Sequence, residues 1–129
     1  MTAENLIKLA QQAREQAYSP YSQFPVGAAL QGRSGRIYCG CNVENVSYGL
    51  TVCAERVAVF KAISEGEREF DAIAVVTSNG GSPCGACRQV LAEFNHKIAV
   101  YVADTEGEYQ TYCLEELLPD AFLPEDLPS

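Results

Sequence analysis

The spacing of apolar side chains predicts a helix near the N-terminus, followed by several short strands. Between Asn5 and Ala17, apolar residues recur every three or four positions, which is the period of one helical face. Thr2 is the candidate N-cap of this helix, and Pro20 lies just beyond its end. Short apolar runs bounded by turn-forming residues then predict strands. The predicted strands span residues 26–30, 36–41, 72–77, 98–103 and 109–113.

Two internal helices are predicted from their start signals as much as from periodicity. Thr51 is the candidate N-cap of a helix over Val52–Ser64. Ser82 and Pro83 supply an N-cap and a first-turn proline for a helix that reaches Phe94. A short helix is predicted after the last strand, at residues 114–118.

The order of these elements predicts the fold class. The run at 72–77 is continuously apolar and β-branched, which is typical of a strand covered on both faces. Residues 104–108 are too few for a crossover, so the last two strands are expected to be antiparallel. We therefore expect an α/β protein. Its predicted architecture is a three-layer α/β/α sandwich with a mixed sheet of about five strands, formed by one domain over residues 1–129.

Composition and charge narrow the function classes. The chain has 129 residues, of which 47% are apolar and 20% charged, as in an ordinary globular domain. A formal net charge of −8 argues against binding to nucleic acid or to an acidic membrane, since both depend on clusters of Lys and Arg. No apolar run approaches the ~18–20 residues that span a bilayer, and residues 1–17 lack the apolar core of a signal peptide. We expect a cytoplasmic protein.

The six cysteines point to metal binding or catalysis, because no secretion signal accompanies them. Cys84 and Cys87 form a Pro-Cys-x-x-Cys motif where a helix is predicted to begin. Positions i and i+3 share one helical face, so both sulfurs can bind one metal ion. The positive end of the helix favours the thiolate, which is the ligating form. This motif by itself is equally compatible with a redox pair or with two small core residues.

Cys53 strengthens the metal interpretation. It falls in the first turn of the preceding predicted helix, and two helix N-termini can converge beyond the carboxyl ends of parallel strands. Three thiolates with one open position are typical of a catalytic zinc site, whereas a structural site uses four protein ligands. The candidates for a fourth ligand are Cys39, Cys41, Cys113 and His96. We expect these three cysteines to be small buried residues and the histidine to be a solvated helix terminus.

Glu55 is the candidate acid–base residue. It does not share a helical face with Cys53, so it need not compete for the metal. Beside an open metal position it can accept a proton from water and pass it to a leaving group. The alternative is a surface charge that stabilises the helix N-terminus. Arg56 and Arg88 directly follow metal-ligand candidates, and each either offsets thiolate charge or is a plain surface residue.

Cys-Ala-Glu-Arg at 53–56, followed by Pro-Cys-x-x-Cys at 83–87, resembles the zinc-dependent nucleoside and nucleobase deaminases. The similarity extends over nearly the whole chain to the small cytidine deaminases. It includes the segments 19–30, 40–45, 47–51, 115–119 and 121–122. The resemblance implies that Cys53, Cys84 and Cys87 bind one Zn²⁺ ion and that Glu55 shuttles protons. Arg56 matches an arginine that hydrogen-bonds the zinc thiolates.

The resemblance also implies a binding site for a nucleoside. It implies that Asn42 and Glu44 hydrogen-bond the ribose 3′-hydroxyl and that Phe24 lines the pocket. The backbone N–H of Ala54 is implied to bind the pyrimidine O2.

Activity and assembly are likewise implied by the resemblance. The implied reaction is hydrolytic deamination of free cytidine and deoxycytidine to uridine and deoxyuridine, with release of ammonia, in pyrimidine salvage. Tyr48 and Phe122 match positions that complete a neighbouring subunit's pocket, which implies a homotetramer. The net charge of −8 fits a neutral nucleoside better than a polynucleotide, and Glu44 near the sugar disfavours phosphorylated substrates.

Three alternatives stay open from the sequence. A deaminase of another cytosine-containing nucleoside keeps the chemistry and changes the substrate. A structural zinc module predicts a closed site with Cys41 or Cys113 as the fourth ligand. A redox protein predicts that Cys84 and Cys87 cycle between thiols and a disulfide, without zinc.

Overall fold

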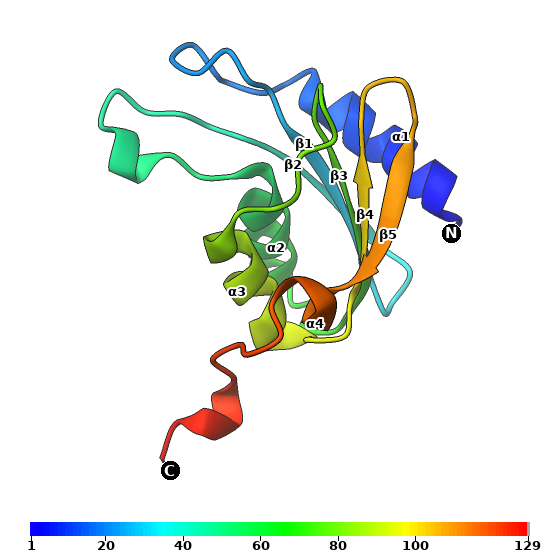
Figure 1. The fold of residues 1–129 in the computed structure, drawn as a ribbon, viewed down its shortest axis with the longest axis vertical. Coiled ribbons are helices and arrows are strands. Elements are labelled where there is room, and N and C mark those ends of the chain that lie inside the picture. The colour runs from blue at the N-terminus through cyan, green and yellow to red at the C-terminus, as the bar shows by residue number, and fades with distance from the viewer. Residues whose placement is uncertain (129) are drawn as a thin grey trace.

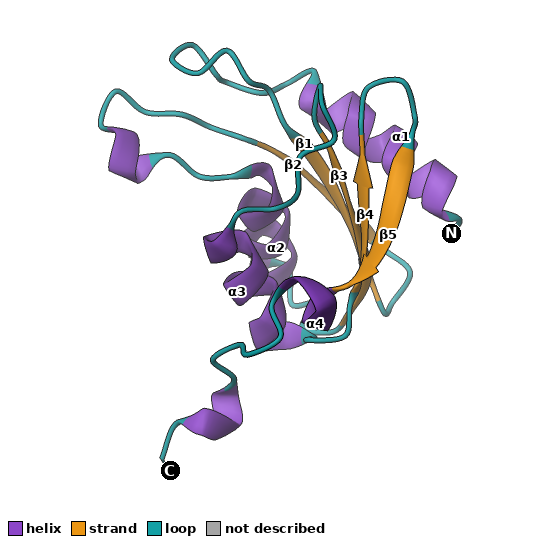
Figure 2. Cartoon of the chain, viewed as in Figure 1, coloured by secondary structure: helices purple, strands orange, loops and turns teal. Residues whose placement is uncertain are grey.

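The computed structural model describes residues 1–128, and within them four α-helices surround one five-stranded sheet (Figures 1 and 2). The helices are α1 (Ala3–Arg14), α2 (Ala54–Ser64), α3 (Gly85–Phe94) and α4 (Leu114–Leu117). The strands are β1 (Gly27–Gly32), β2 (Ile37–Cys41), β3 (Phe70–Val76), β4 (Ala99–Ala103) and β5 (Tyr109–Cys113). Two short 3₁₀ helices, η1 (Tyr48–Leu50) and η2 (Pro124–Asp126), lie within loops.

The sheet is mixed, with the strand order β2-β1-β3-β4-β5. Only β3 and β4 pair in parallel, and every other neighbouring pair is antiparallel. Since β2 and β3 are both antiparallel to β1, they run in the same direction as each other. The helices α2 and α3 follow β2 and β3 along the chain, so both begin at the edge where these strands end.

Helices cover both faces of the sheet, as Figure 1 shows, which confirms the predicted three-layer sandwich. The face under α1 is built mainly from small side chains, so this helix packs closely. That core consists of Leu6, Ile7, Ala10, Ala29, Ala72, Ala74, Val76 and Ala103. The opposite face, under α2, α3 and α4, carries the larger core with the bulkier branched and aromatic side chains, including Leu30, Phe70, Ile73, Val100 and Leu114.

The first helix begins as predicted and ends earlier. Thr2 is its N-cap, and the Thr2 hydroxyl accepts a hydrogen bond from the backbone N–H of Asn5 at 3.1 Å. The N–H groups of residues 16 and 17 bond carbonyls only three positions back, so the α-helical pattern stops before Ala17. At 12 residues α1 is the longest helix, and none in the described part of the chain is long and apolar enough to cross a bilayer.

The predicted N-caps of the two internal helices are wrong, and both helices begin two residues later. Cys53 is the N-cap of α2, because Val52 is still extended and paired in a β-bridge. Cys84 is the N-cap of α3, in place of Ser82. Thr51 instead accepts a hydrogen bond from a loop N–H. At α2, the pairing of Val52 with Val43 therefore overrides a good local capping signal.

Glycines set how closely two helices approach the sheet. A Cβ atom on Gly40 in β2 would lie 2.5 Å from the carbonyl oxygen of Ala54 and 2.7 Å from the nitrogen of Ala58. A Cβ atom on Gly27 in β1 would lie 2.0 Å from the carbonyl oxygen of Ala10. The backbones of α2 and α1 therefore rest directly on the sheet at these points.

We expect Gly40→Ala to lower the free energy of unfolding by about 1–3 kcal/mol, the usual consequence of overpacking a close contact. Urea denaturation measures this change. Gly49→Ala is the control, because a Cβ atom there meets nothing within 4 Å, and it is expected to change stability by less than about 0.5 kcal/mol. Equal stabilities of the two variants would contradict this account of α2 packing.

Candidate active site

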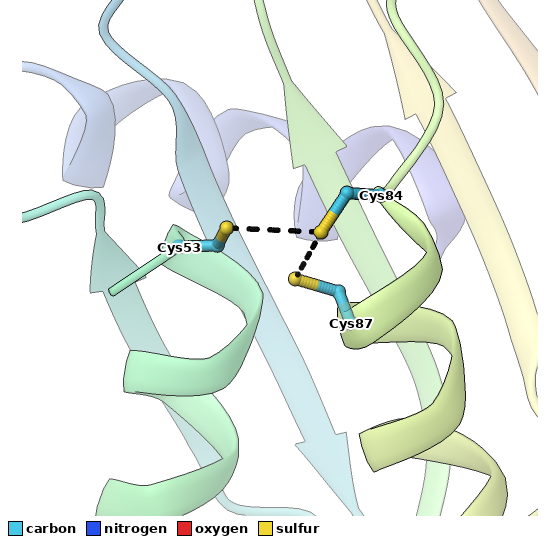
Figure 3. A group of neighbouring side chains, drawn as sticks. All are labelled: Cys53, Cys84 and Cys87. Carbon is cyan, nitrogen blue, oxygen red and sulfur yellow. Dashed lines mark hydrogen bonds between the residues drawn. The ribbon is translucent and has the colours of Figure 1, made fainter. Parts of the chain in front are cut away.

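Three cysteine thiols meet where α2 and α3 begin, and in Figure 3 their sulfur atoms point toward one another. Cys53 and Cys84 are the N-caps of the two helices, and Cys87 lies in the first turn of α3. The Sγ atoms of Cys53 and Cys84 are 3.9 Å apart, and those of Cys84 and Cys87 are 3.4 Å apart. All three Sγ atoms lie within 4.8 Å of one another.

This spacing fits a zinc ion. Tetrahedral zinc with Zn–S bonds of ~2.3 Å separates its sulfur ligands by about 3.8 Å, and thiolates are the soft ligands that zinc accepts. Within residues 1–128, these three cysteines are the only group of three or more His, Cys, Asp or Glu side chains close enough to share a metal ion. The remaining cysteines and His96 stay outside it, so the cluster has the three protein ligands typical of a catalytic site.

The thiols of Cys53 and Cys87 differ in how readily they lose a proton. A hydrogen bond with Cys87, aided by Arg56, lowers the pKa of Cys53 to about 5. The same hydrogen bond and burial raise the pKa of Cys87. The Arg56 Nη2 donates to the Cys53 sulfur at 3.4 Å, and its buried Nε has no hydrogen-bond partner in the described part of the chain. The guanidinium is thus well placed to balance the thiolate charge that metal binding requires.

Arg88 fits neither of its two interpretations, charge balance for the thiolates or a plain surface residue, because it is half-buried and hydrogen-bonded to backbone carbonyls. Its Nε donates to the carbonyl oxygen of Pro83 at 2.8 Å, and its Nη1 donates to that of Leu117 at 2.7 Å. His96 is also not the solvated group that was predicted. It is half-buried, and its Nε2 lies 2.7 Å from the carbonyl oxygen of Leu118. Because a carbonyl only accepts, this contact places a proton on Nε2.

The other three cysteines were expected to be buried, and this prediction is wrong, because each of them is half-buried. Cys39 and Cys41 lie on β2, and Cys113 ends β5. The strands β2 and β5 are the two edge strands of the sheet, so one side of each strand is open.

Glu55 lies in the first turn of α2 and is only 4% exposed, which rules out the alternative of a surface charge. Burial raises the pKa of its carboxyl group to about 7. A carboxyl group with this pKa can both take up and release a proton near neutral pH.

Glu55 and two of the cysteines line a cavity of about 280 Å³, just below the ~300–1,000 Å³ that is usual for small-molecule sites. Its lining comes from the loop before β1, the ends of β2 and β3 and the starts of α2 and α3. The lining residues are Ser22, Phe24, Val26, Asn42, Glu44, Thr51, Cys53, Ala54, Glu55, Val75, Thr77, Gly81, Ser82 and Cys84.

The polar wall of this cavity is held by side chains that bind loop backbone. The Asn42 amide accepts from the N–H of Val26 at 2.9 Å and donates to the carbonyl oxygen of Phe24 at 3.0 Å. The Glu44 carboxylate accepts from the N–H groups of Tyr21 and Ser22 and from the Ser22 hydroxyl. The Ser22 hydroxyl bond is the main cause that lowers the pKa of Glu44. Each group keeps unused hydrogen-bonding capacity for a ligand.

Ala54 contributes its backbone. It is fully buried and is the first residue of α2, and the N–H groups of the first helical turn have no partner within the helix. Its position in the cavity wall therefore suits an N–H donor for a ligand oxygen.

Tyr48 and Phe122 lie outside this cavity. A second hollow of about 320 Å³ adjoins the cavity at Ser22, Glu44 and Thr51 and is lined further by Tyr21 and Tyr48. The Tyr48 side chain is 75% exposed, and its ring centroid lies 5.9 Å from that of Tyr21. The two loops that carry these tyrosines project from the same end of the molecule (Figure 1).

Phe122 is 57% exposed, in the C-terminal segment, and lines neither hollow of its own chain. In contrast, the cavity includes Ser22 and Thr77, which the sequence reasoning missed. Thr77 had a signal, because it directly follows a buried strand at the sheet edge where α/β sites form. Ser22 is recognised only from its contact with Glu44.

Comparisons with known proteins agree with this geometry. Residues 1–103 match the family model described as "Cytidine and deoxycytidylate deaminase zinc-binding region". A cytidine deaminase from Sporosarcina psychrophila is 55% identical over 98% of this chain and 96% of its own length. One from Halalkalibacterium halodurans is 54% identical over 98% of each chain. The crystal structure of a cytidine deaminase from Burkholderia pseudomallei, 50% identical, superposes with a TM-score of 0.91 over 95% of this chain and 100% of its own.

We expect the purified chain to contain about one zinc ion per chain and Cys53→Ala to contain little, because two thiolates bind zinc far more weakly than three. Elemental analysis measures both. Cys39→Ala is the matched control, since Cys39 is also half-buried but lies outside the cluster. Loss of zinc from the control, or its retention in Cys53→Ala, would contradict the assignment of the cluster.

Proposed function

Because the chain belongs to the cytidine and deoxycytidylate deaminase zinc-binding family, we propose that it is a zinc-dependent cytidine deaminase. It hydrolyses free cytidine and deoxycytidine to uridine and deoxyuridine and releases ammonia, a reaction of pyrimidine salvage. The observation that carries this proposal is the buried carboxyl group of Glu55 beside three convergent thiols, in a cavity that is also lined by the polar side chains of Asn42 and Glu44.

Cys53, Cys84 and Cys87 are the proposed zinc ligands, and Arg56 balances their charge through its hydrogen bond to the Cys53 sulfur. When bound, Zn²⁺ lowers the pKa of a coordinated water toward neutrality and so supplies the nucleophile.

Glu55 moves the protons of the reaction. It accepts the proton of the attacking water and delivers it to N3 of the cytosine ring as oxygen adds to C4. It then transfers the remaining hydroxyl proton to the 4-amino group. The C4–N4 bond breaks, ammonia leaves and the C4 carbonyl of uracil forms. The pKa of about 7 suits both directions of this transfer at neutral pH.

Four cavity residues are the proposed contacts for the nucleoside. The Ala54 N–H donates to the pyrimidine O2, and Phe24 covers the pocket. Asn42 and Glu44 bind the ribose 3′-hydroxyl with the hydrogen-bonding capacity that the loop backbone leaves unused. The negative charge of Glu44 at this end disfavours a phosphorylated sugar.

We further propose a homotetramer whose pockets are shared between subunits. The support is the exposure of several large apolar side chains on the loop after β2, on α2 and in the C-terminal segment, since exposed apolar surface is a feature of interaction sites. These side chains are Val46, Tyr48, Leu50, Phe60 and Phe122. The second hollow, bordered by Tyr48, gives a neighbouring subunit access to the nucleoside end of the cavity. All six cysteines are free thiols, which suits the proposed cytoplasmic location.

Glu55→Gln tests the reaction. We expect this variant to fold and to keep its zinc while turnover falls by roughly 10²–10⁴-fold or more, the usual contribution of a positioned acid–base group. The ultraviolet absorbance change on loss of cytidine measures turnover. Glu65→Gln, at the exposed C-terminal end of the same helix, is the control and should keep full activity.

Three outcomes of this assay would change the proposal. Near-normal turnover by Glu55→Gln removes this residue from the mechanism. Zinc-loaded wild-type protein that converts another cytosine-containing nucleoside but neither cytidine nor deoxycytidine changes the substrate. A zinc-loaded chain with no deaminase activity supports a structural metal site.

Phe122→Ala tests the shared pocket. We expect wild-type protein to have about four times the 14.0 kDa mass of one chain by light scattering. The variant should raise KM by roughly 3–10-fold, the usual worth of one aromatic contact, with little change in kcat. Leu127→Ala is the control, because Leu127 is a comparably exposed apolar residue in the same segment. A monomeric wild-type protein with full activity would defeat the proposal of shared pockets.

A further inference from the structure

Cys84 is the least enclosed of the three clustered cysteines. It is exposed, whereas Cys87 is fully buried in α3 and Cys53 is half-buried at the start of α2. It ends the connection from β3 to α3, over residues 77–84, and no side chain caps the helix there. The position of its sulfur therefore depends on how firmly this connection is held.

Arg88 holds the end of the connection nearest to Cys84. Its guanidinium group joins the carbonyl oxygen of Pro83, immediately before Cys84, to that of Leu117, the last residue of α4. Pro83 is buried, and α4 is fixed to the core by the fully buried Leu114. The planar fork of arginine thus ties the backbone beside Cys84 to an element that is packed against the sheet.

Thr77 holds the other end of the connection. It is only 4% exposed, and its hydroxyl group accepts from the N–H of Gly81 at 2.9 Å and donates to the Asn79 side-chain oxygen at 3.2 Å. The Asn79 oxygen also accepts from the Gly81 N–H at 3.0 Å. The backbone N–H of Thr77 is bonded to the carbonyl oxygen of Ala103, beside the end of β4. One buried hydroxyl group therefore holds the turn by hydrogen bonds, and the residue that carries it is anchored to the sheet through its backbone.

We propose that Arg88 and Thr77 are positioning residues that set how tightly the site retains zinc, by restricting the backbone that carries Cys84. Neither residue belongs to the thiol cluster. Zinc leaves a three-thiolate site only after one sulfur detaches, and the exposed Cys84 has the most room to do so. The proposal rests on the zinc site of the proposed function and is independent of the reaction performed there.

The test measures zinc release from the zinc-loaded protein into an excess of a chromogenic chelator. We expect Arg88→Met to release zinc roughly 10–100-fold faster, the range found when partners that orient metal ligands are lost. Arg88→Lys separates positioning from charge. It keeps the positive charge, but its single nitrogen does not reproduce the two-pronged bridge. We therefore expect its release rate to lie near that of Arg88→Met.

Arg68→Met is the matched control. Arg68 also donates to a backbone carbonyl, that of Ile63 at 2.7 Å, but it is exposed and lies beyond the opposite end of α2. Its loss removes the same charge and the same kind of bond, so zinc release should stay at the wild-type rate.

Thr77→Val is the second variant, and it tests the positioning proposal even if Arg88→Met does not fold. It keeps the shape of the side chain and removes its hydrogen bonds, so we expect roughly 2–10-fold faster release. Wild-type release rates in Thr77→Val and Arg88→Met, or full retention of zinc in Arg88→Lys, would overturn the proposal. Zinc-loaded wild-type protein without cytidine turnover would defeat the proposed function alone, and wild-type protein that binds no zinc would defeat both.

Discussion

Three sulfur atoms within 4.8 Å of one another are the constraint on which the rest of the structure depends. Such a cluster gathers negative charge as it loses protons, and repulsion opposes this unless positive groups lie nearby. Two helix N-termini and the Arg56 guanidinium supply them. This arrangement requires both helices to begin at the same sheet edge, which the common direction of β2 and β3 provides. It also requires α2 to lie close to β2, which Gly40 permits.

The cavity wall holds two glutamates in different surroundings. At the thiol end, the Glu55 carboxyl group is buried, and desolvation raises its pKa, with the charge of Cys53 acting in the same direction. At the other end, Glu44 accepts three hydrogen bonds, and its pKa is lowered. Two glutamates in one cavity thus differ in proton affinity because their surroundings differ. One is suited to exchange protons, and the other to remain a charged hydrogen-bond acceptor.

Signals that are local in sequence predicted much of this molecule. The capping by Thr2 and the alternation of strands and helices depend on neighbouring residues, and the structure has both. The motif spacing of Cys84 and Cys87, with Cys53 one element earlier, likewise identified the cluster. The wrong predictions concern features that are determined by contacts with other parts of the chain. Val52 is held extended by a bridge to Val43, at the other end of the connection from β2 to α2, and this bridge moves the start of α2. Arg88 donates to carbonyls that no motif reveals.

The hydrogen bonds of Asn42 and Glu44 to the loop before β1 have a consequence for ligand binding. These two side chains fix the segment from Tyr21 to Val26 against the end of β2 before any ligand arrives. The conformational entropy of that wall is therefore lost during folding rather than during binding. A ligand that enters meets acceptors already in place, so its own contacts contribute to affinity almost undiminished. Folding stability and substrate affinity thus both depend on the same few hydrogen bonds.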